Sequence, residues 1–150
     1  MNLIVDTREQ KWGHVRAYFE EHGLQFENRK LDFGDYMMPG GTVSVDRKQN
    51  LDELAQNLCT ADSRRFWNEI RGASKAGIHL VVLCEHGGKI RTIRDVKTWK
   101  SCYTKITGEM IFRKMFMASA AYGVEFRFCN KGETGAWIVE ILGGADNGRQ

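Results

Sequence analysis

Residues 78–85, IHLVVLCE, constrain the fold more than any other segment, because they form the most strand-like run of the chain. A strand that is apolar on both faces has to be covered on both faces, and such strands lie inside sheets that helices flank. Helical and strand-like segments alternate along the rest of the chain. This alternation favours an α/β fold with a mixed or mainly parallel sheet.

Hydrophobic periodicity places the remaining elements around this strand. The alternating pattern predicts strands, and the helical spacing of apolar residues predicts helices that end at glycines such as Gly23 and Gly77. Asn50 is suited to cap one helix, and Glu53 stands in its capping-box position. We therefore expect strands at residues 3–5, 25–32, 34–38, 42–48 and 124–129, and helices at 11–23, 50–58, 64–77, 107–122 and 133–142, the last closed by Gly143 and Gly144.

The 150 residues predict a single domain over 1–144 and a frayed tail at 145–150. A net charge of +3 permits a polyanion partner without demanding one. No segment approaches the ~20 apolar residues of a membrane span, and the chain has no secretion signal, which predicts a cytoplasmic protein without a membrane partner. The four cysteines are scattered singly, which argues against a zinc site or a disulfide framework.

Charged residues end the strand at 42–48. Side chains in a strand alternate between faces, so Asp46 and Lys48 share one face. A two-residue turn at Gly40-Gly41 would set Asp35 opposite Asp46, with Cβ atoms ~5 Å apart. Two carboxylates at that spacing can share a divalent cation, and oxygen ligands favour Mg²⁺ or Mn²⁺. A lysine beside them can hold the phosphate that such an ion activates for hydrolysis.

The triplet Asp46-Arg47-Lys48 is weak by itself, because D-x-K occurs in many proteins by chance. Its surroundings resemble the xeroderma pigmentosum group F (XPF-type) structure-specific endonuclease family, whose signature is G-D-x(n)-E-R-K-x-x-x-D. The chain has Gly34-Asp35, then Asp46-Arg47-Lys48 and then Asp52 at this spacing, preceded by VDTRE at residues 5–9. With the RFWNEI run and the VVLCE strand, the resemblance covers about residues 3–86.

The resemblance implies a restriction-endonuclease-like fold with a central mixed sheet flanked by helices. It assigns Asp35 and Asp46 as metal ligands and Lys48 as the catalytic lysine, with Arg47 and Asp52 completing the site. Neighbouring elements of the site would be Asp6, as a further metal ligand, with Arg8 and Glu9. Asp46 stands where the family usually has glutamate, and its shorter arm could weaken metal binding.

Simpler readings stand beside these assignments. Asp52 complements the dipole at a helix N-terminus whether or not it serves catalysis. Arg8 and Glu9 could form an ordinary surface ion pair. Asp6 is harder to explain in this way, because an acid that closes a buried strand of an α/β sheet lies where sites form.

Two basic groups are candidates for contacts with DNA phosphates, and a solvated surface explains each nearly as well. The first follows the site along one helix: Arg64, Arg65 and Arg71. The second forms an arm that also carries Trp99 and Tyr103: Lys89, Arg91, Arg94, Lys97 and Lys100.

The helix at 107–122 is apolar over most of its circumference. Either it is enclosed in a single core, or it also forms a subunit interface. The resemblance gives the interface as much support as the enclosed helix, because the family pairs its nuclease domains as dimers.

Taken together, the sequence predicts an Mg²⁺- or Mn²⁺-dependent DNA endonuclease that acts on branched or flap DNA. The stand-alone size resembles that of short bacterial or phage-encoded nucleases, and the tandem helix-hairpin-helix module of larger family members has no counterpart in the sequence. The alternative is a catalytically silent DNA-binding or scaffolding subunit. Four retained charged residues, Asp35, Asp46, Lys48 and Asp52, argue against it, because a silent subunit gains nothing from crowded like charges.

Overall fold

The structure is a computed structural model that describes the backbone of residues 1–147 and the side chains of residues 1–144. Within this range six strands form one sheet: β1 (Asn2–Val5), β2 (Gln25–Asn28), β3 (Tyr36–Met37), β4 (Val43–Lys48), β5 (His79–Cys84) and β6 (Glu125–Phe128). The strand order is β2-β1-β3-β4-β5-β6, and β3 alone runs antiparallel to its neighbours β1 and β4. The mixed sheet flanked by helices confirms the predicted fold class.

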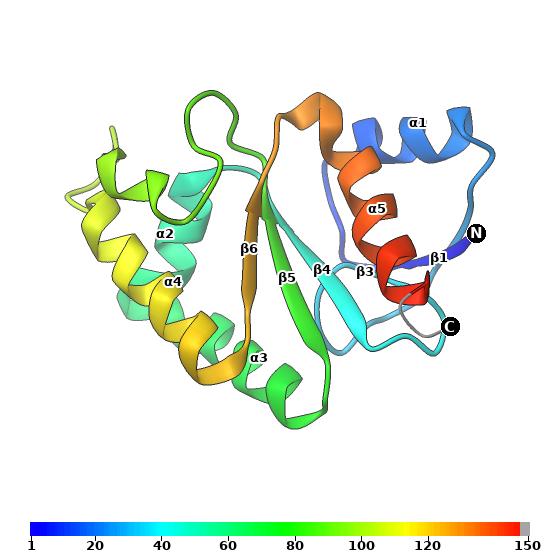
Figure 1. Cartoon of the computed structure of the whole chain (residues 1–150), viewed down its shortest axis with the longest axis horizontal. Coiled ribbons are helices and arrows are strands. Elements are labelled where there is room, and N and C mark those ends of the chain that lie inside the picture. Colours follow the sequence, from blue (N-terminus) through cyan, green and yellow to red (C-terminus); the bar gives the residue numbers. More distant parts are fainter. Residues whose placement is uncertain (148–150) are drawn as a thin grey trace.

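Helices cover both faces of this sheet (Figure 1). One face packs against α2 (Leu51–Cys59), α3 (Arg64–Lys75) and α4 (Gly108–Tyr122). The other face packs against α1 (Gly13–Glu21) and α5 (Thr134–Asn147). Short 3-10 turns, η1 (Ala61–Ser63), η2 (Asp95–Thr98) and η3 (Lys131–Glu133), lie in the connections. The sheet therefore separates two hydrophobic cores.

β5 contributes to both cores, as its sequence predicts. Leu80, Val82 and Cys84 are buried in the core under α2, α3 and α4. Val81 and Leu83 are buried in the core under α1 and α5. The strand has hydrogen-bonded neighbours on both edges, so the only environment that suits its side chains is an interior one.

The turn between β3 and β4 differs from the expected one. Gly41 N donates to Met38 O at 2.9 Å, so Pro39 and Gly40 occupy the middle of the turn, and Gly40 takes a φ of +71°. Proline presets the first central position of such a turn and glycine suits the left-handed second one. The pairing register is nonetheless the expected one, with Tyr36 opposite Val45.

Several element boundaries also differ from the sequence predictions. β2 ends at Asn28 instead of 32, and β3 keeps only two residues, because the intervening chain leaves the ladder to form one wall of a cleft. α5 continues through Gly143 and Gly144 to Asn147. Residues 148–150 of the predicted tail lie outside the described residues, so its fraying stays a prediction. Between residues 1 and 147, no helix is long and apolar enough to cross a membrane.

Candidate active site

A cleft of about 610 Å³ opens between the loop that leads into β3, the C-terminal half of β4, and α3. Acids dominate its walls: Asp6, Asp32, Asp35, Asp46 and Glu69. Three cations, Arg8, Lys48 and Arg65, share the cleft with them. The sheet and α3 thus bring together residues that are up to 63 positions apart, from Asp6 to Glu69.

Asp35 and Asp46 lie side by side in this cleft. Extending the β3–β4 register by one residue places them opposite one another, as predicted. Asp35 Oδ2 accepts a hydrogen bond from Arg47 N at 2.8 Å, which ties its carboxylate to β4. Asp46 is buried, and its Oδ2 atom has no hydrogen-bond partner within the described part of the chain. A buried carboxylate oxygen without a donor is costly unless a cation reaches it.

Gly34 makes this arrangement sterically accessible. Its φ is +75°, and a Cβ atom built on it would lie 2.0 Å from Ser44 Oγ. Only glycine combines that backbone conformation with such a close approach. Ser44 Oγ in turn donates to Phe33 O at 2.7 Å, which holds the loop against β4. The glycine before Asp35 therefore serves to bring the aspartate against the strand.

Lys48 shares the face of β4 that carries Asp46, as strand alternation predicts. Its Nζ lies 3.5 Å from Asp46 Oδ2 and 4.4 Å from the centre of the Phe66 ring. Burial favours the neutral amine, but nearby carboxylates, Asp46 first, outweigh it and raise the pKa of Lys48. The lysine is therefore a charged donor at neutral pH.

Glu69 is a cleft residue that the sequence analysis missed. Its Oε1 accepts a hydrogen bond from Gly34 N at 2.9 Å, so α3 and the loop before β3 meet at this carboxylate. Arg65, Asn68 and Glu69 line the cleft together. Their spacing of three and four residues on a helix whose buried face holds Phe66 and Ile70 is the signal that could have found them.

Two carboxyl groups of the cleft, those of Asp35 and Glu69, are placed so that they resist ionisation. Burial first, and then the negative charges of Asp46 and Glu9, raise the pKa of Asp35 well above that of an ordinary carboxyl group. Burial and the charge of Asp46 likewise raise the pKa of Glu69, although the Gly34 hydrogen bond opposes them. Asp35 keeps some surface open to the cleft, so a cation arriving there would relieve this repulsion.

Asp6 closes β1 and lines the same cleft, but hydrogen bonds already occupy both of its oxygens. Leu31 N donates to Oδ1 at 2.8 Å, and Arg8 Nε donates to Oδ2 at 2.9 Å. Arg8 Nη2 also reaches Leu31 O at 2.7 Å. Burial alone would raise the pKa of Asp6, but these hydrogen bonds lower it. In this arrangement Asp6 holds Arg8 and the loop around Leu31 in place.

Arg47 and Glu9 lie on the opposite face of the sheet from Asp46. The Arg47 side chain is 2% exposed, and its Nε donates to Glu9 Oε2 at 3.0 Å. Its Nη1 donates to Glu85 Oε1 at 2.5 Å. Glu85 Oε2 accepts from Thr134 Oγ1 at 2.5 Å and pairs with His14 Nε2, also at 2.5 Å. The structure therefore joins β4, β5, α1 and α5 through this buried ion network, and neither Arg47 nor Glu9 lines the cleft.

Asp52 lies in the first turn of α2 and does not line the cleft either. Its Oδ1 accepts a hydrogen bond from the buried Ser101 Oγ at 2.7 Å. Asn50 caps the same helix through a 2.8 Å bond from Glu53 N, as predicted. The aspartate that ends the motif therefore joins α2 to the loop before α4.

Of the basic residues predicted to contact DNA phosphates, one lines the cleft and the others lie outside it. On α3, Arg65 lines the cleft, Arg64 is exposed, and Arg71 donates to Asn68 Oδ1 at 2.8 Å. The arm residues Lys89, Arg91, Arg94, Lys97 and Lys100 are all exposed and lie outside the cleft.

A divalent cation fits the chemistry of the cleft. Asp46 offers a buried oxygen that accepts no hydrogen bond, and burial together with the charge of Asp46 raises the pKa of Asp35 and of Glu69. All three supply oxygen donors, which Mg²⁺ and Mn²⁺ prefer. As the side chains stand in residues 1–147, no three acids, histidines or cysteines are grouped closely enough to enclose a metal ion. The cleft therefore suits an ion that two carboxylates would hold and whose other ligands would be water or substrate oxygens.

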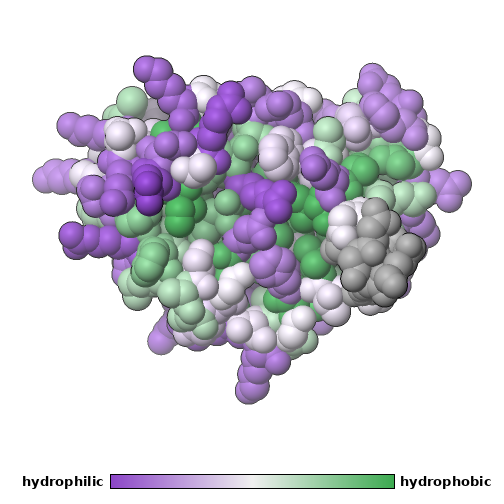
Figure 2. Space-filling view, in the orientation of Figure 1, coloured by the Kyte–Doolittle hydropathy of each residue, from purple (hydrophilic) through white to green (hydrophobic). Residues whose placement is uncertain are grey.

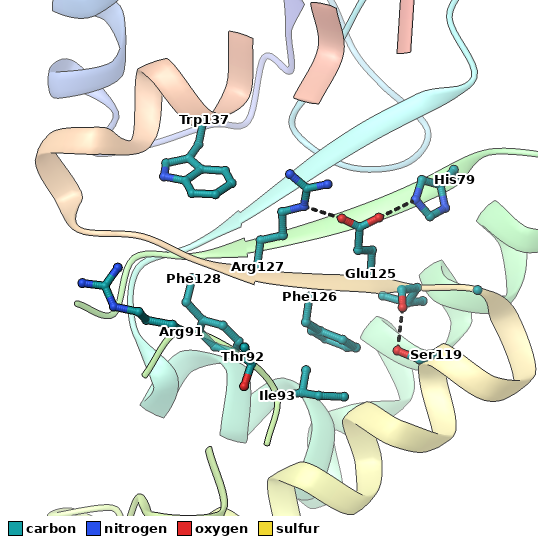
Figure 3. Close-up of a pocket in the computed structure, with 12 residues that line it drawn as sticks. His79, Arg91, Thr92, Ile93, Ser119, Glu125, Phe126, Arg127, Phe128 and Trp137 are labelled. Carbon is teal, nitrogen blue, oxygen red and sulfur yellow. Dashed lines mark hydrogen bonds and ion pairs between the residues drawn. The ribbon is translucent and has the colours of Figure 1, made fainter. Parts of the chain in front are cut away.

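A second pocket, of about 530 Å³, lies along the free edge of β6. Figure 3 shows Glu125 bridging Arg127 and His79 on one side of this strand, whereas Phe126 and Phe128 point to the other side. The one acid of this pocket, Glu125, is already bonded to Arg127 and His79, so the chemistry of the 610 Å³ cleft is not repeated here.

Comparisons with known proteins agree with this geometry. A sequence model of the ERCC4 domain matches residues 5–141. The structure resembles that of XPF from Aeropyrum pernix, with a TM-score of 0.73, 18% identity and 99% of this chain covered. It also resembles XPF from Aeropyrum pernix in complex with DNA, with a TM-score of 0.70, 16% identity and 98% covered. The chain spans 66% of each of those two chains. Among curated proteins the comparison finds no match.

Proposed function

Because the chain belongs to the ERCC4 domain family, we propose that it is a metal-dependent endonuclease that hydrolyses DNA phosphodiester bonds at branched or flap structures. One observation carries the proposal: Asp35, Asp46 and Lys48 meet in one cleft, where Asp46 Oδ2 is buried without a hydrogen-bond donor. A buried carboxylate oxygen that accepts no hydrogen bond and has only the Lys48 ammonium 3.5 Å away destabilises a fold, so its presence is best explained by a function that needs it.

Three of the acids that line the cleft, Asp35, Asp46 and Glu69, are the groups that would hold the ion. Asp46 supplies its Oδ2 atom, which accepts no hydrogen bond. Asp35 faces Asp46 across the two strands, and a hydrogen bond from Gly34 N holds Glu69 nearby. A bound Mg²⁺ or Mn²⁺ supplies an acidified water and neutralises negative charge on the scissile phosphate. Asp6 contributes by fixing Arg8 at the rim, since its own oxygens are occupied.

Lys48 binds the phosphate as a cation. Its raised pKa keeps it protonated at neutral pH, so it donates a proton in a hydrogen bond and does not act as a base. Phe66 and Asp46 fix the position of its ammonium group before substrate arrives. A donor that is already in place stabilises developing charge without reorganisation.

Arg47, Glu9 and Asp52 act at a distance from the reacting atoms in this proposal. Arg47 joins β4 to Glu9 and Glu85, which fixes the backbone that carries Asp46 and Lys48. These three residues are therefore positioning residues, although the family resemblance groups them with the catalytic motif.

DNA is the proposed substrate because cations flank the acidic cleft. Arg8 and Arg65 line the cleft itself, where they can bind the phosphates on either side of the scissile bond. One of the two similar structures is a complex of XPF with DNA, which supports the same class of ligand. Further phosphate contacts are proposed for Arg64, Arg71, Lys89, Arg91, Arg94, Lys97 and Lys100.

We also propose that two copies pair through α4. Phe116 and Met117 are 57% and 53% exposed on this helix, and the Phe112 ring is tilted by 34° against the Phe116 ring, with ring centroids 6.2 Å apart. The C-terminal end of α4 borders the pocket along the β6 edge, so an interface could continue from the helix onto the sheet. Light scattering tests this: Phe116→Glu should turn a dimer into a monomer, and a monomeric wild type contradicts the pairing.

Cleavage of a labelled DNA panel tests the nuclease. The panel holds a single strand, a duplex, a splayed arm, a 3′ flap and a four-way junction, each with Mg²⁺, Mn²⁺ or EDTA. We expect metal-dependent cutting of the branched substrates, which Asp46→Ala abolishes and the exposed cleft variant Asp32→Asn retains. If wild type and Asp46→Ala both bind DNA and neither cuts it under any condition, the chain is the silent subunit instead.

A further inference from the structure

Tyr103 is the most exposed large apolar side chain among residues 1–144. Its surface is 85% accessible, whereas Phe116, the next in order, is 57% accessible. Within the described residues its ring and hydroxyl form no hydrogen bond, ion pair or ring contact. A single exposed aromatic ring is common on protein surfaces, so Tyr103 indicates a ligand only together with the loop and the charges that accompany it.

Hydrogen bonds fix the backbone of the loop that carries Tyr103. Ser101 is buried, and its Oγ accepts hydrogen bonds from Tyr103 N and Thr104 N, both at 3.1 Å. Ser101 N donates to Ile106 O at 3.3 Å, and Lys100 pairs with Thr107 across the base of the loop. The backbone under Tyr103 is therefore fixed before any ligand binds.

The anchor of this loop is Asp52, the last residue of the nuclease-like motif. Ser101 Oγ donates to Asp52 Oδ1 at 2.7 Å, so the same hydroxyl that receives the loop's two N–H groups binds α2. Asp52 has no place in the cleft. Its side chain instead fixes the loop to the helix that directly follows the catalytic strand.

Positively charged residues lie close to Tyr103 in the sequence. Lys100 and Lys105 flank it in the loop, and both are exposed. Lys97, which lies in η2 just before this loop, places its Nζ 4.3 Å from the centre of the Phe112 ring of α4. Figure 2 shows strongly hydrophilic side chains projecting from this end of the molecule, at the left of the view. Cations around a solvent-facing aromatic ring are the pattern of single-stranded nucleic acid sites.

We propose that Tyr103 stacks on an unpaired base of the DNA substrate, while Lys100 and Lys105 bind the phosphates beside it. The proposal rests on the proposed function and adds to it a contact outside the cleft that recognises single-stranded arms. Stacking is sequence-tolerant, because every base has a π-face, whereas a paired base inside a duplex cannot reach the ring. Asp52 is the positioning residue of this contact.

Binding of a splayed-arm DNA and of the matching duplex, measured in EDTA by fluorescence anisotropy, tests the proposal. Tyr103→Ala should weaken splayed-arm binding by about 5- to 100-fold and leave duplex binding unchanged. Tyr103→Trp should retain the affinity, and Cys102→Ala, in the same exposed loop, is the matched control. Lys105→Ala should weaken both DNAs and reduce the slope of log affinity against log salt by about 1.

Asp52→Ala tests the anchor. It should weaken splayed-arm binding as Tyr103→Ala does, and combining the two changes should add little, because both remove one ordered loop. Asp52→Asn, whose amide oxygen can still accept from Ser101, should restore most of the affinity. Quenching of 2-aminopurine placed in the arm reports stacking directly and should disappear in Tyr103→Ala.

The outcomes separate the two proposals. Equal splayed-arm affinity of wild type and Tyr103→Ala overturns the stacking contact and leaves the nuclease untouched. Loss of duplex binding in Tyr103→Ala also overturns it, because the effect would then concern the fold or general affinity. A wild type that neither binds nor cuts any DNA of the panel overturns the nuclease and the stacking contact together.

Discussion

Replacing Asp35 by asparagine should stabilise the metal-free protein, although it should also abolish cleavage. Burial and the charge of Asp46 raise the pKa of Asp35, so its ionised form costs free energy of folding at neutral pH. Asparagine has the same shape, and its amide oxygen can still accept the 2.8 Å hydrogen bond from Arg47 N. The change therefore removes repulsion while it preserves the contact.

The expected size follows from the register. Two unit charges about 5 Å apart repel by about 3 kcal/mol at an effective dielectric constant of about 20. The nearby Lys48 ammonium offsets part of this repulsion. We therefore expect Asp35→Asn to raise the free energy of unfolding by about 1–2 kcal/mol, which corresponds to about 3–6 °C in Tm for a chain of this size.

The pH dependence has a definite sign. Below about pH 3.9, the ordinary carboxyl pKa of an unfolded chain, Asp35 is protonated in both states and costs nothing. As pH rises, the unfolded state releases this proton first, so wild-type stability falls relative to the variant until pH passes the raised pKa of Asp35 in the folded state. The stability difference should therefore grow from pH 4 upward and then level off.

Thermal unfolding in EDTA, followed by circular dichroism, measures these values, and Asp32→Asn provides a matched control. Asp32 is exposed on the wall of the same cleft, and its replacement should change stability by less than about 0.5 kcal/mol. Mg²⁺ at about 100 times its Kd should stabilise wild type by about 2.7 kcal/mol and Asp35→Asn far less. An Asp35→Asn variant that is less stable than wild type at pH 7 would refute the crowding, and equal stabilisation by Mg²⁺ would refute the ligand assignment.

Three further changes test the surroundings of the cleft. Gly34→Ala should lower the free energy of unfolding in urea by about 2 kcal/mol or more, because it strains a positive φ and has no room for Cβ, whereas Gly132→Ala should be nearly neutral. Glu85→Ala should cost about 3–5 kcal/mol in the same assay, because it leaves the Arg47 guanidinium buried without one of its partners; a cost below 1 kcal/mol would mean that the network is not needed for folding. Lys48→Met should lower the urea midpoint, because Asp46 loses the cation 3.5 Å away, and should weaken DNA binding, because a phosphate contact is lost; at saturating DNA it should also lower the cleavage rate by about 100-fold or more, and unchanged cleavage would exclude the lysine from the reaction.

Local periodicity accounts for several of the predictions that the structure confirms. The two-sided burial of β5 follows from its apolar run, and the capping of α2 follows from Asn50 and Glu53 three residues apart. Asp46 and Lys48 share a face because strands repeat every two residues. The opposition of Asp35 and Asp46 follows from chain reversal at Pro39-Gly40, even though the turn itself was misplaced by one residue.

Local periodicity does not predict contacts between segments that are far apart in the sequence. Glu69 lies 35 positions from its donor Gly34, and the sequence offers no sign that α3 passes this loop. The motif residues gave no indication that Arg47 binds Glu85, 38 positions away, on the face opposite the cleft. Strand alternation predicts that Arg47 points to the face of β4 opposite Asp46 and Lys48. Which residues it contacts there depends on the helices that cover that face.

The sequence by itself determined the elements of this protein and the pairing of its two central carboxylates, because both depend on spacings of a few residues along the chain. Only the tertiary structure decided which charged residues of the motif share the cleft. Asp46 and Lys48 enter it, Arg47 turns into a buried ion network, and Asp52 anchors the loop of Tyr103. The physical reason is that burial and ion pairing depend on all the segments packed around a side chain, and local spacing does not contain that information.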